Sequence, residues 1–102
     1  MLNMHYFKDQ ICDELCGAKA YVKKALEIKS HSASWGKQFL DMSSVEINHA
    51  TTLYHICEEY YKEISASYEQ VSDYLEQCMK DIINIYTEKI SKIKYMQDMY
   101  NR

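Results

Sequence analysis

Three side chains in the first part of the chain, two carboxylates and one imidazole, have the types and spacing of a metal site. Glu46 and His49 are three residues apart, so on a helix they project from the same face. Glu14 stands in an earlier segment with the same helical periodicity. Carboxylate oxygens combined with an imidazole nitrogen suit iron or manganese. Metal binding at these residues therefore depends on whether the fold brings Glu14 to the other two.

Segments with a helical repeat of apolar residues account for nearly the whole chain. Steps of four and three residues alternate, which is typical of one face of an amphipathic helix. This pattern predicts helices over residues 4–29, 35–64 and 68–100. The 102 residues include no proline and two glycines, and hairpin turns depend on those residue types, which argues against a sandwich or barrel. We therefore predict an all-α fold with a single domain over residues 1–102.

The predicted inner face of each helix follows one apolar line. The line of the first helix comprises Phe7, Ile11, Glu14, Ala18, Tyr21, Ala25 and Ile28. The line of the second comprises Trp35, Phe39, Met42, Glu46, His49, Leu53, Ile56, Tyr60 and Ile64. The line of the third comprises Val71, Leu75, Cys78, Met79, Ile82, Tyr86, Ile90, Ile93, Met96 and Tyr100. A carboxylate on such a face is costly unless it is paired, hydrogen-bonded or metal-bound, which makes Glu14 and Glu46 conspicuous.

The short connection at residues 30–34 predicts that the first two helices are antiparallel. In such a pair, residues whose numbers add up to roughly 60–64 lie at the same height. Glu14 meets this condition with both Glu46 and His49. The sequence therefore predicts that these three side chains lie side by side.

The second break, at residues 65–67, predicts that the third helix turns back in the same way. Ser67 followed by Gln70 indicates an N-terminal capping box for that helix. The break contains neither glycine nor proline, so one continuous bent helix over the second and third segments is the alternative.

The surroundings of the candidate ligands resemble one half of the motif of ferritin-like proteins, close to the rubrerythrin type and to small single-domain forms. The resemblance rests on Asp13-Glu14-Leu15 with Ala18 and Tyr21, and on Glu46-Ile47-Asn48-His49-Ala50. It implies iron, as a di-iron centre, or manganese, and oxidation of Fe(II) linked to oxygen or peroxide. It further implies that Glu46 is a bridging carboxylate and His49 a terminal nitrogen ligand.

The chain departs from that family because it carries one half of the ligand set, whereas a full ferritin-like bundle has four helices and two halves. Two copies could each contribute a half. The ten tyrosines and six methionines also exceed what a three-helix core needs. We therefore predict an antiparallel three-helix, ferritin-like half-bundle that is completed by oligomerisation, as a homodimer or larger assembly.

The third helix offers a different completion of the cluster. Glu88 is at the height of Glu46 but off the predicted apolar face, whereas Lys89 is predicted to point inward. An inward ammonium would neutralise the two carboxylates without a metal. The alternative function is therefore a non-enzymatic helical interaction module with a structural buried Glu/His/Lys cluster.

The remaining composition excludes several classes of protein. The net charge of −3 argues against a nucleic-acid binder. No apolar run is long enough to span a bilayer, and the N-terminus has no apolar core of a signal peptide, so we expect a cytoplasmic protein without a membrane partner.

We interpret the four cysteines as reduced and largely buried, and a metal or redox pair of Cys12 and Cys16 is the alternative. We interpret His5, His31 and His55 as solvated side chains.

Overall fold

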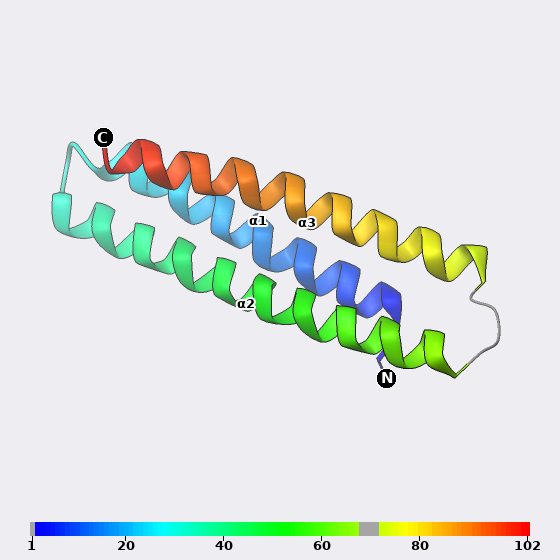
Figure 1. Cartoon of the computed structure of the whole chain (residues 1–102). Coiled ribbons are helices and arrows are strands. Elements are labelled where there is room, and N and C mark those ends of the chain that lie inside the picture. The colour runs from blue at the N-terminus through cyan, green and yellow to red at the C-terminus, as the bar shows by residue number, and fades with distance from the viewer. Residues whose placement is uncertain (1, 68–71) are drawn as a thin grey trace.

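The computed structural model describes residues 2–67 and 72–102. Three helices follow one another: α1 (Met4–Ile28), α2 (Ala33–Ala66) and α3 (Asp73–Tyr100) (Figure 1). Figure 1 shows α2 running antiparallel to α1, and α3 returning beside α1 in the same direction as α1. The described part of the chain contains no strand, which confirms the predicted all-α fold. The molecule is a flat rod with extents of 58 × 22 × 15 Å.

Side-chain caps define where the helices begin. Asn3, Ser32 and Ser72 each accept a hydrogen bond from a backbone N–H in the first turn of α1, α2 and α3. The predicted capping box includes Gln70, which lies outside the described residues, and Ser67 instead caps the C-terminus of α2. The alternative of one continuous helix is wrong, because α2 ends before this point and α3 runs back along the molecule.

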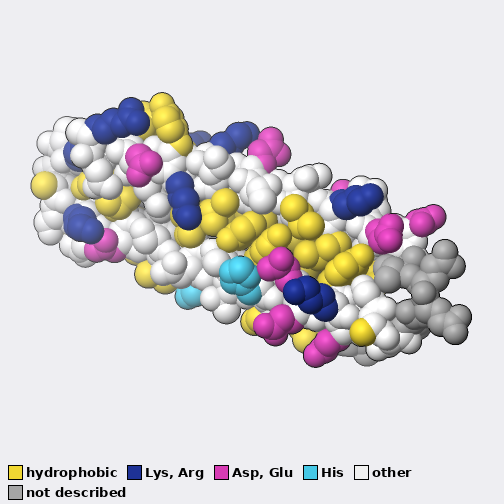
Figure 2. Space-filling view, in the orientation of Figure 1, with side chains coloured by type: hydrophobic (Ala, Val, Ile, Leu, Met, Phe, Trp, Pro, Cys, Tyr) yellow, Lys and Arg dark blue, Asp and Glu magenta, His cyan; other side chains and the backbone are white. Residues whose placement is uncertain are grey.

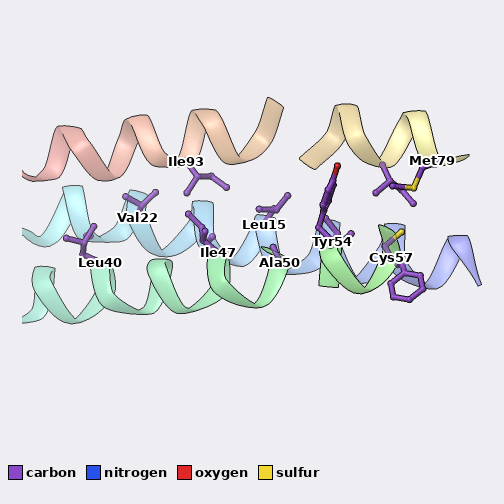
Figure 3. Close-up of a cluster of buried hydrophobic side chains, with 14 of the residues drawn as sticks. Leu15, Val22, Leu40, Ile47, Ala50, Tyr54, Cys57, Met79 and Ile93 are labelled. Carbon is purple, nitrogen blue, oxygen red and sulfur yellow. The ribbon is translucent and has the colours of Figure 1, made fainter. Parts of the chain in front are cut away.

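Helix α1 is the centre of the structure, because α2 and α3 both pack against it and contact each other at few places. Figure 3 shows Leu15 and Val22 of α1 lying between Ile47 of α2 and Ile93 of α3. The buried line of α1 comprises Met4, Phe7, Ile11, Leu15, Ala18, Val22 and Ala25. The predicted line was correct at four of these positions, but Leu15 and Val22 replace Glu14 and Tyr21, which are half-buried.

The buried line of α2 is displaced by one residue from the predicted one. It comprises Gly36, Leu40, Ser43, Ile47, Ala50, Tyr54 and Cys57. Two neighbouring lines on α2 are both largely apolar, and α1 packs against the one that contains small residues, which allow close approach of the backbones. The predicted line therefore lies at the edge of the helix pair, where Trp35, Met42 and Ile56 are 54%, 42% and 44% exposed.

A buried polar contact joins all three helices. The hydroxyl of Ser43 donates to the carbonyl oxygen of Ala18 at 2.7 Å and accepts from the side-chain amide of Gln97 at 3.0 Å. Because the hydroxyl is fully buried, these two bonds remove the cost of its desolvation. They also fix the heights of α2 and α3 relative to α1.

The C-terminus is held against the turn between α1 and α2. The Lys29 ammonium donates to the carbonyl of Tyr100 and lies 4.6 Å from the centroid of its ring. Gly36 leaves the space that the Tyr100 hydroxyl occupies, since a Cβ at this position would lie 2.7 Å from it. This contact fixes the last turn of α3 against the other two helices.

Apolar side chains also reach the surface. Figure 2 shows a band of them along the long axis of one face, bordered by charged groups. None of the helices described is long and apolar enough to cross a membrane.

Candidate metal site

The fold brings together the three residues singled out from the sequence. Glu14 of α1 and Glu46 and His49 of α2 each offer one ligand atom, and these atoms all lie within 4.8 Å of one another. Within residues 2–67 and 72–102, no other group of three His, Cys, Asp or Glu side chains converges in this way. This confirms the prediction that Glu14 lies at the same height along the helix pair as Glu46 and His49.

The cluster lies at the edge of the α1–α2 interface and not in the core, because the buried line of α2 is displaced by one residue and Leu15 takes the inner position predicted for Glu14. The side chain of Glu14 is 24% exposed and that of His49 is 56% exposed. An ion could thus reach the site from solvent, while the carboxylates remain partly shielded by the two helices.

The neighbouring carboxyl of Glu14 changes the pKa of Glu46. A hydrogen bond to Glu14, burial and the Glu14 charge raise the pKa of Glu46 above its ordinary value, and the nearby His49 opposes the rise. With both carboxyls ionised, no described residue donates a hydrogen bond to Oε2 of Glu14, which is enclosed by protein. Nδ1 of His49 lies 3.4 Å from that oxygen. A cation at this point would satisfy the oxygen and neutralise charge on the two carboxylates, so the donor set fits a metal ion.

Gly17 lies beside the candidate ligands, although it was not among the site residues predicted from the sequence. The Glu46 side chain lies across Gly17, where a Cβ would be 3.5 Å from the carboxylate Oε2. Gly17 stands one turn after Glu14 on the same flank of α1. A glycine inside a predicted helix, one turn from a candidate ligand, is the signal that would have identified it.

The prediction that Lys89 points inward is wrong, whereas Glu88 lies off the apolar face as predicted. Glu88 and Lys89 are both exposed, and they line a different cavity between α1 and α3 together with Cys16 and Lys19. Helix α3 lies on the other flank of α1. The long side chain of Lys89 extends from the apolar face of α3 into solvent. There is consequently no buried Glu/His/Lys cluster among the described residues.

The other histidines have partners that are unrelated to the site. Nε2 of His5 lies 2.7 Å from the hydroxyl of Tyr74, and Nδ1 of His55 lies 3.0 Å from a carboxylate oxygen of Glu58. His31 lies against the Trp35 ring. All three are exposed, as predicted.

The four cysteines are free. Only Cys57 is fully buried, where burial and the Glu58 charge raise its pKa to about 11. The exposed Cys16 departs from the prediction of largely buried thiols.

A partly exposed apolar stripe runs along α2 on both sides of the cluster, with three residues exposed and three half-buried against the core. We define the α2 stripe as Trp35, Phe39, Met42, Leu53, Ile56 and Tyr60. These residues follow the same line as Glu46 and His49, at steps of three and four. A cavity of about 330 Å³ near the start of the stripe is lined by Trp35, Gln38, Phe39 and Met42. The candidate ligands therefore lie in the middle of a surface that can be covered by another apolar surface.

Comparison with protein-family models, curated proteins and solved structures finds no match for this chain. The class of protein that the structure defines is an all-α chain of three helices with a carboxylate–histidine cluster between the first two. The resemblance to ferritin-like proteins rests on Glu14, Glu46 and His49 with their neighbours, and it remains a prediction.

Proposed function

We propose that this chain binds a divalent metal ion, Fe(II) or Mn(II), through Glu14, Glu46 and His49. The observation that carries the proposal is the convergence of these three ligand atoms within 4.8 Å, around an enclosed Glu14 oxygen that lacks a hydrogen-bond donor among the described residues. Two carboxylates with one imidazole favour these ions over Cu(I), which prefers sulfur ligands.

Each residue has a distinct task in this proposal. Glu14 and Glu46 approach from different helices and supply negative charge, and His49 supplies a neutral nitrogen. The ion binds the ionised carboxylates, so binding strengthens as the pH rises through the raised pKa of Glu46. Bound iron would supply one-electron redox chemistry, and the ferritin-like resemblance makes oxidation of Fe(II) the proposed activity.

We further propose that the chain functions as a homo-oligomer in which two copies complete one centre. Three protein ligands leave coordination positions open, and the partly exposed α2 stripe, with Trp35, Met42 and Ile56 open to solvent, supports pairing of two such faces. Pairing about a twofold axis through the cluster would bring a second Glu14, Glu46 and His49 to the first. The two half-sites would then form the di-metal set implied by the resemblance.

An anaerobic Fe(II) titration of the purified protein tests the proposal. Wild type should bind Fe(II), and both Glu46→Gln and His49→Ala should lose most of the binding. His55→Ala is the matched control, because this histidine is on the same helix, pairs with Glu58 and is not part of the cluster. Exposure of loaded wild type to air should then give ferric absorption, and failure of wild type to take up Fe(II) or Mn(II) would refute the proposal.

The second candidate function is a non-enzymatic helical interaction module, and the partly exposed α2 stripe is the observation that favours it. In that case the protein self-associates or binds a protein partner without metal. Light scattering of metal-free protein separates the two functions when it is combined with the titration. A mass above 12.1 kDa with no metal uptake supports the interaction module.

A further inference from the structure

A cavity lined by lysines lies between α1 and α3, on the opposite flank of α1 from Glu14. Its volume is about 180 Å³, and Leu15 and Ile93, both nearly fully buried, form its apolar floor. Lys19, Lys89 and Lys92 line it, and we call this feature the α1–α3 groove. The groove is unrelated to the proposed metal site and lies on the flank that α3 covers.

The groove concentrates positive charge in a chain whose net charge is −3. Its three lysines come from two helices and are exposed to solvent, and Glu88 is the single carboxylate of its lining. None of the three lysines forms an ion pair within the described ranges, whereas Lys37 pairs with Asp41 in its own helix. Like charges held at one cavity repel one another, and a bound anion would relieve that repulsion.

The groove also extends beyond this cavity. An adjoining hollow of about 480 Å³ shares Lys19 and Lys92 and continues to Tyr95 and Met96. The Tyr95 ring is 58% exposed there. The groove thus combines a cationic end with an aromatic end along the same pair of helices.

We propose that the α1–α3 groove binds a multivalent anion of the phosphate class, namely pyrophosphate or the diphosphate end of a nucleotide. Three ammonium groups opposed by one carboxylate leave an excess of positive charge that a monovalent anion would not neutralise. Lysine binds phosphate groups as a compact point charge, without the planar geometry that arginine requires. The lysines would bind either pyrophosphate or the diphosphate of a nucleotide. Tyr95 distinguishes the two ligands, because only a nucleotide carries a base that can pack against its ring.

Calorimetric titration of the full chain with pyrophosphate, in metal-free buffer of low ionic strength, tests the proposal. Wild type should bind, and Lys89→Gln and Lys92→Gln should each weaken the affinity by about fivefold or more. Lys94→Gln, on the same helix but outside the groove lining, should change it by less than about twofold. Circular dichroism of each variant checks that the helices are retained, and Fe(II) binding should be unaffected by Lys89→Gln.

Alkylation of Cys16 supplies an independent readout, because this exposed thiol lies in the groove lining. Its rate with neutral iodoacetamide, followed by peptide mass spectrometry, should fall when pyrophosphate is bound. If ADP binds more tightly than pyrophosphate and Tyr95→Ala removes that advantage, the anion is part of a nucleotide. If ADP has no such advantage, the anion is free pyrophosphate.

Three results would overturn the proposal. The first is absence of pyrophosphate and ADP binding by wild type at millimolar concentration, without protection of Cys16. The second is a loss of pyrophosphate affinity in Lys94→Gln equal to that in Lys89→Gln, which would indicate non-specific electrostatic binding. The third is tighter binding of a poly-glutamate peptide than of either phosphate compound, which would identify the groove as a surface for an acidic protein.

Discussion

The same glycine-to-alanine substitution should have opposite effects at the two glycines of the chain. Gly17 lies inside α1, where alanine favours the helix by about 1 kcal/mol. A Cβ there would be 3.5 Å from Oε2 and 3.6 Å from Cδ of Glu46, which are ordinary contacts. Gly17→Ala should therefore raise the free energy of unfolding by about 0.5–1 kcal/mol and the Tm by about 2–8 °C.

At Gly36 the intrinsic gain in helix propensity is similar, but the space is filled. A Cβ would lie 2.7 Å from the Tyr100 hydroxyl and 3.2 Å from Cα of Lys29, and the second of these atoms belongs to the backbone. Overpacking of this kind costs about 1–3 kcal/mol, which outweighs a propensity gain of about 1 kcal/mol. Gly36→Ala should therefore lower the free energy of unfolding, by up to about 2 kcal/mol.

Urea denaturation of metal-free protein, followed by far-ultraviolet circular dichroism, measures both effects. The double variant Gly36→Ala/Tyr100→Phe is the control, because it removes the nearest atom and should recover part of the lost stability. A Gly36→Ala variant as stable as wild type would refute the packing of Tyr100 against α2. A destabilised Gly17→Ala variant would mean that the space beside Glu46 is needed by another group.

Three further predictions concern the site, the core and the α2 stripe. The hydrogen bond to Glu14 raises the folded-state pKa of Glu46 above 4.5, so stability falls as the pH rises through that pKa. Urea denaturation at about pH 4 and pH 7 should therefore show metal-free Glu46→Gln to be more stable than wild type at the higher pH only. Ser43→Ala removes a buried hydroxyl bonded to α1 and α3 and should cost about 1–2 kcal/mol in the same assay; no loss would mean that the two bonds contribute nothing. Met42→Glu with Ile56→Glu should shift light scattering toward the 12.1 kDa monomer without loss of helix, and an unchanged oligomer would exclude the α2 stripe as the interface.

The heights of residues along the helices could be predicted from the sequence. Height depends on the rise per residue and on where the chain turns, and the connection between α1 and α2 is short. Glu14, Glu46 and His49 were consequently placed at one level, and the structure confirms it. The three helices were also predicted within a few residues, apart from the start of the third, since residues 68–71 lie outside the described ranges.

The rotation of each helix could not be predicted in the same way. A shift of one residue turns the inner face by about 100°, and α2 has two adjacent apolar lines that both satisfy the helical repeat. Packing against α1 selects the line with Ser43 and Ala50, because small side chains let the helices approach closely. Which line is buried therefore depends on the surfaces of both α1 and α2, and not on the sequence of α2 alone. This explains why the candidate ligands were predicted in the core and lie at its edge.

Thermal unfolding with and without Mn(II) tests the central claim of a metal site most directly. An ion that binds only the folded chain stabilises it by about 2.7 kcal/mol at a free concentration of 100 times Kd. For a domain of this size, the Tm of wild type should then rise by about 10–20 °C. Glu46→Gln should show little or no rise, and His55→Ala should behave as wild type. An unchanged Tm of wild type across the Mn(II) titration, or an equal rise in Glu46→Gln, would contradict a metal site at Glu14, Glu46 and His49.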